Sequence, residues 1–319
     1  MITWQEILTY AHGNNPSPDI RIVATDELWA ERLPHDVYEI VRGKGTERPF
    51  SSPLCSSFES GVYACVCCHT PLFDNVSKFE SGTGWPSFTE PVSHHVLAYQ
   101  ADDSNNMERI EVTCATCDAH LGHVFNDGSR ADEVRYCMNA RALYLSQASQ
   151  KTAVIGGGCF WCTEAIFKNL PGITSIMTGY SGGDTLFPTY DDVCTGDTGH
   201  AEVIHIVYDE EYISYKEIID IHLQTHNPTT RNKQGTDIGT QYRSIVFYQN
   251  DDEKIIAQKS ITRSQKLYND PIVTEIKKLE VFYIAETYHQ DYYAKNPNQP
   301  YCLSIIDPKI KKLTDENIL

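Results

Sequence analysis

ACVCCHT (residues 64–70) and VTCATCD (residues 112–118) each carry a pair of cysteines separated by two residues. One tight turn can present both sulfurs of such a pair to a single ion, and two pairs together complete a tetrahedral site. This spacing predicts a structural Zn²⁺ site. Four sulfur ligands leave no position open for a catalytic water. The expected ligands are Cys65, Cys68, Cys114 and Cys117.

Two other interpretations of these cysteines remain open. The four thiols could be inert and buried, or two of them could form a redox-active pair, with Cys67 as a spare sulfur beside them. A zinc ribbon that binds nucleic acid would carry the same spacing. The formal net charge of −17 counts against nucleic acid, because its phosphates would be repelled.

Around these cysteines, short segments with partial alternation of apolar and polar residues predict a mostly β first domain. Helical patterns occur mainly near the start of the chain, at residues 2–11 and 26–33. The expected strands lie at residues 61–68, 108–114, 120–125 and 135–145.

The small, polar segment at residues 147–151 predicts a linker between a first domain of residues 1–146 and a second of residues 152–319. The second half mixes helix and strand patterns, which indicates an α+β domain. Ser214 and Glu217 form a capping box that predicts a helix start. After about residue 288 the chain becomes polar and loop-like. Strands are expected at residues 152–158, 203–209 and 242–249, and helices at residues 159–170, 213–228 and 251–268.

Composition places the chain among globular proteins, with 41% hydrophobic and 22% charged residues. We expect neither a secretory signal nor a membrane span, since no run approaches about 18 apolar residues. The sequence therefore predicts a cytoplasmic protein with reduced thiols. Eleven cysteines, an odd number, favour metal binding and redox chemistry over a disulfide scaffold.

Four further strings in the first half are KGTERPF (44–50), SGTGWPSF (81–88), HLGHVFNDG (120–128) and RYCMN (135–139). Together they resemble the methionine sulfoxide reductase B family across roughly residues 30–146. The resemblance implies that Cys137 is the nucleophile. Its implied neighbours are Trp85, His120, His123, Arg135 and Asn139.

The residue types fit that chemistry. A thiolate that attacks a sulfoxide sulfur needs cationic or hydrogen-bonding groups beside it, which Arg135 and the two histidines can supply. Trp85 can form a wall for the substrate methyl group. Alternatively, His120 and His123 could be packed core residues.

Many members of that family carry a second, recycling cysteine where this chain has Thr83. Another subset carries it after the TERPF string, where Cys55 stands here. The resemblance therefore implies that Cys55 resolves the oxidised nucleophile, and a bystander thiol is the alternative.

The second half carries GGCFWCTEA (157–165), PTYDDVCTGDTGHAEV (188–203), GTDIGTQYRS (235–244) and AETYHQDYYAKNPNQPYC (285–302). These strings resemble methionine sulfoxide reductase A across nearly all of residues 151–302, which implies a ferredoxin-like core and Cys159 as nucleophile. The implied apolar pocket consists of Phe160 and Trp161. The residues implied to hold the sulfoxide oxygen are Tyr190, Glu202, Asp237 and Tyr242.

Physical chemistry supports this assignment. Cys159 follows a glycine turn and begins a predicted helix, where exposed N–H groups would lower its pKa. Glu202 lies in a predicted apolar strand, where burial would raise its pKa and let it donate a proton. The alternatives are a thioredoxin-like CxxC pair for the cysteines and plain core packing for the two aromatic residues. Cys302, in the polar tail, occupies the family's recycling position, and Cys162 is a competing resolver.

The two resemblances imply that the first domain reduces the R epimer of methionine sulfoxide and the second the S epimer. Each nucleophile would become a sulfenic acid, then a disulfide, and thioredoxin would reduce it. Oxidised proteins would be the substrates, and we expect no organic cofactor and no membrane or nucleic-acid partner. A zinc-stabilised binding module fused to a disulfide-exchange domain is the competing hypothesis.

Overall fold

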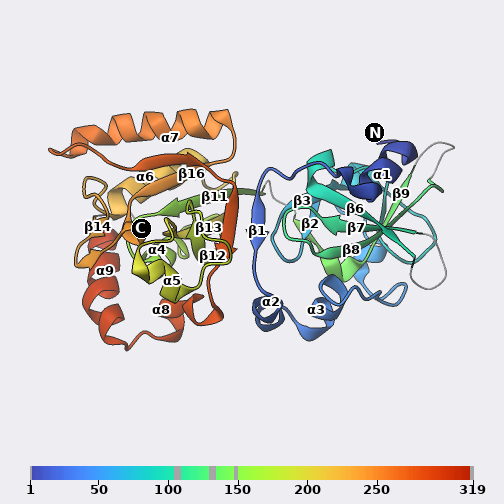
Figure 1. Cartoon of the computed structure of the whole chain (residues 1–319), viewed down its shortest axis with the longest axis horizontal. Helices are drawn as coiled ribbons and strands as arrows, with labels where there is room; N and C mark the ends of the chain where they lie inside the picture. The colour runs from blue at the N-terminus through green and yellow to red at the C-terminus, as the bar shows by residue number, and fades with distance from the viewer. Residues whose placement is uncertain (1, 104–108, 129–133, 147–149, 317–319) are drawn as a thin grey trace. The chain divides into compact units, whose positions relative to one another are not determined.

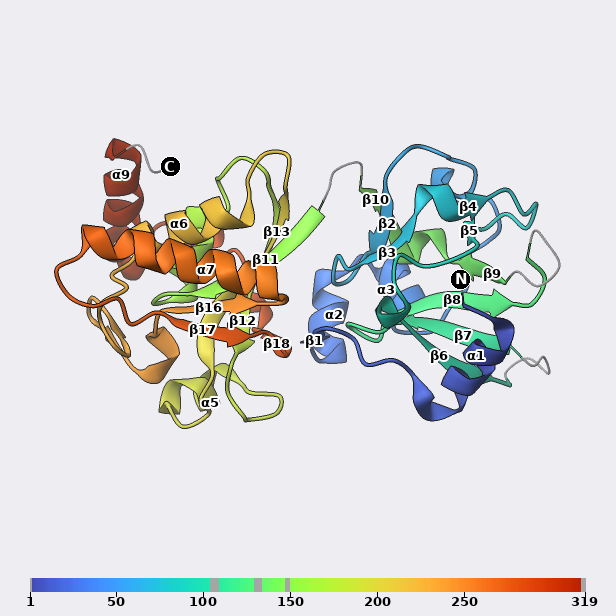
Figure 2. The same cartoon turned by 90° about the horizontal axis from the view of Figure 1, so that it is seen from above.

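The computed structural model describes residues 2–103, 109–128, 134–146 and 150–316. Contacts within the chain divide it into two compact units (Figures 1 and 2). One contains Met1–Arg21 and Thr25–Ser149, and the other contains Ile22–Ala24 and Gln150–Leu319. Residues 147–149 of the expected linker lie outside the described residues, while Gln150 and Lys151 already belong to a strand of the second unit.

The first unit is built on antiparallel sheets, which confirms the prediction of a mostly β domain. A six-stranded sheet has the order β4-β5-β9-β8-β7-β6, and a three-stranded sheet has the order β10-β2-β3. Their strands are β2 (Val62–Cys65), β3 (Pro71–Asp74), β4 (Lys78–Phe79), β5 (Ser87–Phe88), β6 (Leu97–Asp102), β7 (Arg109–Cys114), β8 (His120–Phe125), β9 (Arg135–Met138) and β10 (Leu143–Ser146).

Short helices precede these sheets in the sequence. Thr3 and Glu6 form a capping box at the start of α1, and the Thr25 side chain caps α2. A further helix, α3, was not predicted. The helices are α1 (Trp4–Thr9), α2 (Asp26–Arg32) and α3 (His35–Val41).

The second unit is α+β, as predicted, and contains a seven-stranded sheet of order β1-β18-β12-β13-β11-β16-β17. From β18 to β16 the neighbouring strands are antiparallel, and β16 and β17 are parallel. A separate hairpin pairs β14 with β15. The strands are β1 (Arg21–Val23), β11 (Gln150–Gly156), β12 (Ile173–Ser181), β13 (Ala201–Asp209), β14 (Lys233–Gln234), β15 (Asp237–Ile238), β16 (Ile245–Tyr248), β17 (Glu275–Lys278) and β18 (Val281–Ile284).

Helices pack on this sheet around one apolar core. α4 packs on β12 and β13, while α6 packs on α7 and β11. The predicted capping box is present at the start of α6, where Ser214 Oγ and Glu217 bond reciprocally to the backbone. The helices are α4 (Phe160–Phe167), α5 (Tyr190–Thr195), α6 (Tyr215–Thr225), α7 (Asp251–Ser264), α8 (Tyr292–Lys295) and α9 (Asp307–Asp315).

The prediction of a loop-like tail after about residue 288 is wrong. α8, a π-helical turn at Cys302–Ile306 and α9 follow one another there (Figure 1). Ile306 and Leu313 are buried against the core, and Ile310 packs on it. Because these residues recur at helical spacing, the segment buries one face despite its lysines.

No helix in the described part of the chain combines the length and the apolar character needed to cross a bilayer.

Candidate active sites

The two cysteine pairs of the first unit occupy equivalent turns at the ends of β2 and β7. The His69 N–H donates to the Cys65 carbonyl and the Asp118 N–H to the Cys114 carbonyl, both over 2.9 Å. His69 and Asp118 have positive φ values of 63° and 61°. Two turns of the same geometry thus present their cysteines to one point.

The four sulfurs form a compact, buried cluster with all ligand atoms within 4.8 Å of one another. Cys65 Sγ lies 3.7 Å from Cys117 Sγ, and Cys68 Sγ lies 3.6 Å from Cys114 Sγ. A tetrahedral zinc with sulfurs at about 2.3 Å requires sulfur–sulfur edges of about 3.8 Å. The cluster is therefore compatible with a structural metal.

Cys137 lies on β9, between β5 and β8 in the six-stranded sheet. Its register partners are Ser87 and His123. The close approach of β8 requires glycine at position 122, because a Cβ there would stand 2.2 Å from the Cys137 carbonyl oxygen. Burial raises the pKa of the Cys137 thiol, and this is partly opposed by the charge of Arg135 and a hydrogen bond with Thr83.

A cavity of about 140 Å³ opens beside this thiol. It brings together four of the residues singled out from the sequence, and it also includes Arg109. Those four residues are Cys137, Trp85, His123 and Asn139. His120 lines an adjoining cavity of about 380 Å³ instead, and His123 and Arg109 line both.

Each of the two histidines contacts a carboxylate that also binds a cation. His123 Nε2 lies 2.7 Å from Asp102 Oδ2, which accepts a 2.9 Å bond from Arg109. His120 Nδ1 lies 2.8 Å from Glu111 Oε1, and Lys44 donates to the other oxygen of Glu111 over 2.8 Å.

Burial and these contacts act in opposite directions on the pKa values of Glu111 and His123. Burial alone would raise the pKa of Glu111, but hydrogen bonds from His120 and Lys44 outweigh it and the pKa is lowered. Burial lowers the pKa of His123, although its bond with Asp102 opposes that shift.

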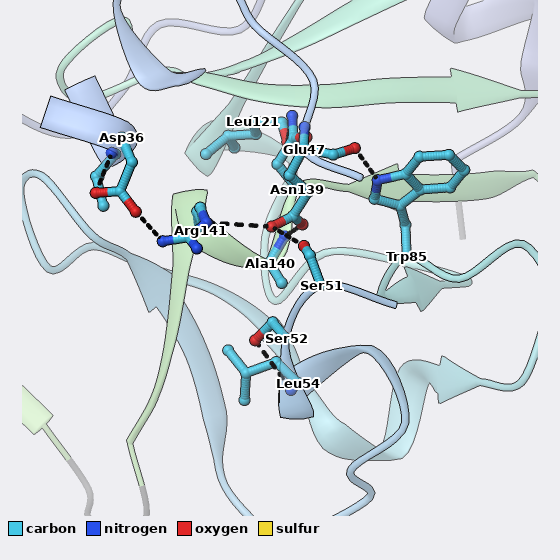
Figure 3. A network of polar contacts seen from close by, with 11 residues as sticks. Asp36, Glu47, Ser51, Ser52, Leu54, Trp85, Leu121, Asn139, Ala140 and Arg141 are labelled. Carbon is cyan, nitrogen blue, oxygen red and sulfur yellow. Dashed lines mark hydrogen bonds and ion pairs between the residues drawn. The ribbon is translucent and has the colours of Figure 1, made fainter. Parts of the chain in front are cut away.

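A network centred on the buried Glu47 holds the walls of the smaller cavity (Figure 3). The Trp85 indole N–H donates to the Glu47 carbonyl over 3.2 Å, and the Glu47 N–H donates to Asn139 Oδ1 over 3.2 Å. The Glu47 carboxylate accepts bonds from the Ala140 N–H and, over 3.0 Å, from Ser51 Oγ. Trp85 and Asn139 are thus positioned by one residue.

Arg135 and Cys55 do not line that cavity. Arg135 makes two 2.9 Å bonds to the carboxylate of Asp127. Cys55 ends a 3₁₀ turn and is 8% exposed. The buried Lys78 ammonium donates to carbonyls on both sides of it, those of Leu54 and Ser57.

In the second unit, Cys159 is the N-cap of α4 and directly precedes Phe160, whose N–H donates to Glu202 Oε2 over 2.9 Å. Glu202 lies on β13 and is 1% exposed. Burial raises the pKa of Glu202 to about 8. The structure therefore brings a buried carboxyl group with a raised pKa to the residue after the candidate nucleophile.

The expectation of a lowered pKa for Cys159 is wrong for the free protein. Burial raises the pKa of this thiol, and contact with Cys162 and the charge of Glu202 add to the shift. The position of Cys159 at the start of a helix therefore lowers its pKa by less than burial and the nearby charge of Glu202 raise it.

Aromatic rings surround this site. Phe160 is fully buried, and the Trp161 ring stacks on Tyr292 at a centroid distance of 3.6 Å. The Trp161 N–H donates to His289 Nδ1 over 3.0 Å, and the His289 ring lies 5.0 Å from that of Phe160. Tyr190 also lies against His289, with centroids 4.4 Å apart.

Polar groups complete the second site. Burial raises the pKa of both Tyr190 and Tyr242, and the charge of Glu202 adds to both shifts. Asp237 Oδ2 accepts a 2.9 Å bond from the Tyr301 hydroxyl, which lies 3.7 Å from Cys162 Sγ.

The two candidate resolvers of this unit differ in their surroundings. The Cys162 N–H donates to the Cys159 carbonyl over 3.1 Å, so both cysteines lie on one helical turn. Contact with Cys159 lowers the pKa of Cys162 to about 7. Cys302 is fully buried in the core, whereas the sequence predicted a polar, loop-like tail at this position.

Several residues of the two sites were missed from the sequence. His289 and Tyr301 lie within the string at residues 285–302, and membership of that string was the available signal for both. Glu47 lies within the string at residues 44–50, which was the available signal for it. Asp102 and Arg109 gave no signal of a role at this site, because only the strand register and the tertiary fold bring them near Cys137.

Comparison with known proteins matches both units to reductase domains. The family described as peptide methionine sulfoxide reductase matches residues 151–318, and the SelR domain matches residues 33–147. The peptide methionine sulfoxide reductase MsrA of Saccharolobus solfataricus is 52% identical over 162 residues, which are 51% of this chain and 92% of that protein. MsrA of Campylobacter jejuni subsp. jejuni serotype O:23/36 is 49% identical over 166 residues, 52% of this chain and 99% of that protein.

Among solved structures, reduced Mxr1 from Saccharomyces cerevisiae is 35% identical and has a TM-score of 0.46, covering 48% of this chain and 89% of its own. The family match alone spans more than half of the 319 residues. The chain therefore belongs to the peptide methionine sulfoxide reductase family and carries an additional SelR domain of the B type before it, which makes it a bifunctional oxidoreductase.

Proposed function

We propose that a first domain of residues 1–146 reduces the R epimer of methionine sulfoxide in oxidised proteins, and that a second of residues 152–319 reduces the S epimer. Residues 147–151 join them. The observation that carries the mechanism is the 2.9 Å bond from the Phe160 N–H to the buried Glu202 carboxyl, one residue from Cys159. The choice of epimer rests on the family resemblance of each domain.

In the second domain, Cys159 attacks the sulfoxide sulfur and Glu202 donates a proton to the oxygen. The thiol and the sulfoxide become a sulfenic acid and methionine, so one oxygen atom passes from sulfur to sulfur. Phe160 and Trp161 enclose the substrate methyl group. The residues that hold the oxygen with Glu202 are Tyr190, Asp237 and Tyr242. The pKa shifts of Tyr190 and Tyr242 support this role, because burial keeps both tyrosines as O–H donors.

In the first domain, Cys137 is the nucleophile and His123 the proton donor. The cavity that both line with Trp85 and Asn139 supports this assignment. Arg135 favours the Cys137 thiolate through its charge. His120 contacts the substrate from the adjoining cavity.

Each sulfenic acid then condenses with a second thiol, so that a disulfide forms and water leaves. We assign this role to Cys55 in the first domain and to Cys302 in the second, with Cys162 as the alternative. A dithiol protein must then reduce the disulfide by exchange, and thioredoxin is the reductant that fits. The cytoplasmic location stays a prediction.

Zn²⁺ is the metal that best fits the four-cysteine cluster of the first domain. Thiolates select zinc over hard cations, and the measured sulfur–sulfur edges support a tetrahedral site. The metal would hold the two cysteine turns together, and because protein ligands fill all four positions, its contribution is to stability.

If these cysteines resolve the sulfenic acids, removing one of them should spare the first turnover of its domain and prevent repeated turnover. In a Cys159→Ser background, Cys55→Ser should leave stoichiometric methionine formation near the parental level and lower thioredoxin-driven turnover by at least about 100-fold. In a Cys137→Ser background, Cys302→Ser and Cys162→Ser should be compared in the same assay. Mass spectrometry of the oxidised chain identifies each disulfide.

A matched control is Cys194→Ser, which removes an exposed thiol of the second unit and leaves a hydroxyl that can keep the hydrogen bond with Tyr190. It should change neither the first turnover nor the cycle. Parental cycling in Cys55→Ser would show that another thiol resolves Cys137, whereas loss of the first turnover would mean that Cys55 acts before the disulfide step.

A further inference from the structure

Four neighbouring strands of the first unit carry a line of neighbouring side chains that ends at Cys137. Asp102 is the register partner of Arg109 across β6 and β7, and His123 on β8 is the register partner of Cys137 on β9. Side chains at paired positions of antiparallel strands share one face of the sheet, with Cβ atoms about 4.5–5.5 Å apart. The sheet therefore places His123 directly beside the nucleophile.

Asp102 holds the imidazole of His123 from the side away from Cys137's strand. Its Oδ2 lies 2.7 Å from His123 Nε2 and accepts a 2.9 Å bond from Arg109 Nη2. The side chains of Asp102 and Arg109 are each 18% exposed, and that of His123 is 13% exposed. Partial burial strengthens such charge-assisted bonds relative to those in bulk water.

The pair of His120 and Glu111 has a similar geometry but a different location. His120 does not line the cavity that holds Cys137, whereas His123 does. The carboxylate on His123 is thus the one that acts on the ring beside the nucleophile. A nucleophile, a proton-transfer group and a third group that orients it form a recurring catalytic arrangement.

We infer that Asp102 is a positioning residue of the first site, whose carboxylate, held by Arg109, orients and charges the His123 imidazole so that it delivers a proton to the sulfoxide oxygen. This inference rests on the proposed function of Cys137 and His123. In the step, the Cys137 thiolate bonds to the sulfoxide sulfur while imidazolium protonates the oxygen. The hydroxyl group then passes from the substrate sulfur to Cys137 Sγ as the substrate S–O bond and the new S–S bond break, which leaves a sulfenic acid on Cys137, methionine and neutral imidazole.

The charges around His123 fix the sign of the expected pH effects. The groups that face it are Asp102, Arg109, His120, Glu111 and Cys137. Burial lowers the pKa of His123, the bond with Asp102 raises it, and the charges of Arg109 and His120 lower it. Removing the carboxylate should therefore lower this pKa further, and removing the guanidinium should raise it.

The test measures the first turnover of the full chain in a Cys159→Ser background, with racemic methionine sulfoxide as substrate, between pH 5 and 9. Asp102→Asn should lower the rate about 100-fold, with little change in the concentration for half-maximal rate. Because the step needs both the Cys137 thiolate and the His123 imidazolium, the rate should rise with pH and level off above the pKa of His123, where each further gain in thiolate is offset by a loss of imidazolium. This levelling should begin at a lower pH in Asp102→Asn. Arg109→Gln should shift it to a higher pH.

A double-variant cycle separates positioning from simple structural support. Asp102→Asn should have little further effect in a His123→Gln background, because both changes remove the same proton donor. Asp26→Asn is the matched control: it also breaks a carboxylate–guanidinium contact in this unit, that with Arg42, and should retain the parental rate.

Additive losses in the double variant, or equal pH profiles in Asp102→Asn and Arg109→Gln, would overturn the inference. Failure of the proposed function is distinguishable, because Cys137→Ser would then still convert the R epimer in the same background. If Asp102→Asn does not fold, the opposite shift expected for Arg109→Gln still decides the matter.

Discussion

Glu202→Gln is expected to slow reduction of the S epimer by about 10²- to 10⁴-fold, the range that general acid catalysis supplies. Gln can still accept the Phe160 N–H bond, so the change removes the acidic proton and little else. The variant should still fold. Burial raises the pKa of the Glu202 carboxyl to about 8, so a neutral amide replaces a group that is mostly neutral at pH 7.

The pKa of Glu202 also predicts how the rate should change with pH. A carboxyl group with a pKa of about 8 carries its proton below that pH and loses it above. The parent's rate should therefore fall as pH rises through about 8, while Glu202→Gln should show no fall in that range. Single-turnover methionine formation in a Cys137→Ser background measures both profiles.

Glu164→Gln is the matched control for this experiment. Glu164 is also buried in the second unit, and burial raises its pKa to about 7, but its carboxyl accepts bonds from the N–H groups of Asp291 and Tyr292. We expect a change of less than about tenfold, since no substrate contact is lost. Equal effects of the two variants would mean that Glu202 acts only through packing.

Removal of the metal is expected to unfold the first unit and leave the second active. Structural zinc supplies about 10–16 kcal/mol of apparent binding free energy at neutral pH, which is comparable to the entire stability of a domain. Cys114→Ser should therefore abolish reduction of the R epimer and eliminate the first unit's thermal transition. The S-epimer activity should remain, because the cluster belongs to one unit alone.

Cys67→Ser provides the control for the metal site. Cys67 is buried in the same turn but is not one of the four clustered ligands. Elemental analysis should find one zinc per chain in the parent and in Cys67→Ser, and less in Cys114→Ser. Loss of the metal from Cys67→Ser alone would contradict the proposed ligand set.

How much of this fold was predictable depended on how local the signal was. The cysteine spacing predicted the cluster because each pair needs only one turn, and the capping box predicted the start of α6 because it involves four consecutive residues. The tail from Cys302 to Asp315 was missed, since its lysines mask an apolar face that recurs at helical spacing. That apolar face packs against the core of the second unit, which is formed by residues distant in the sequence.

The sites show the same limit. The strings that resemble the two families contain both nucleophiles and the proposed pocket residues, but not the carboxylate that orients His123. Asp102 lies 21 residues from His123 in sequence, and only the pairing of β6, β7 and β8 joins them. The pKa expected for Cys159 failed for a related reason: a helix start is visible in sequence, whereas burial is not.

The most direct test of two separate sulfur nucleophiles uses racemic methionine sulfoxide and dithiothreitol with four forms of the chain. The parent is expected to consume both epimers, Cys137→Ser only the S epimer, Cys159→Ser only the R epimer, and the double variant neither. Consumption of either epimer by the double variant at the parental rate would contradict this expectation.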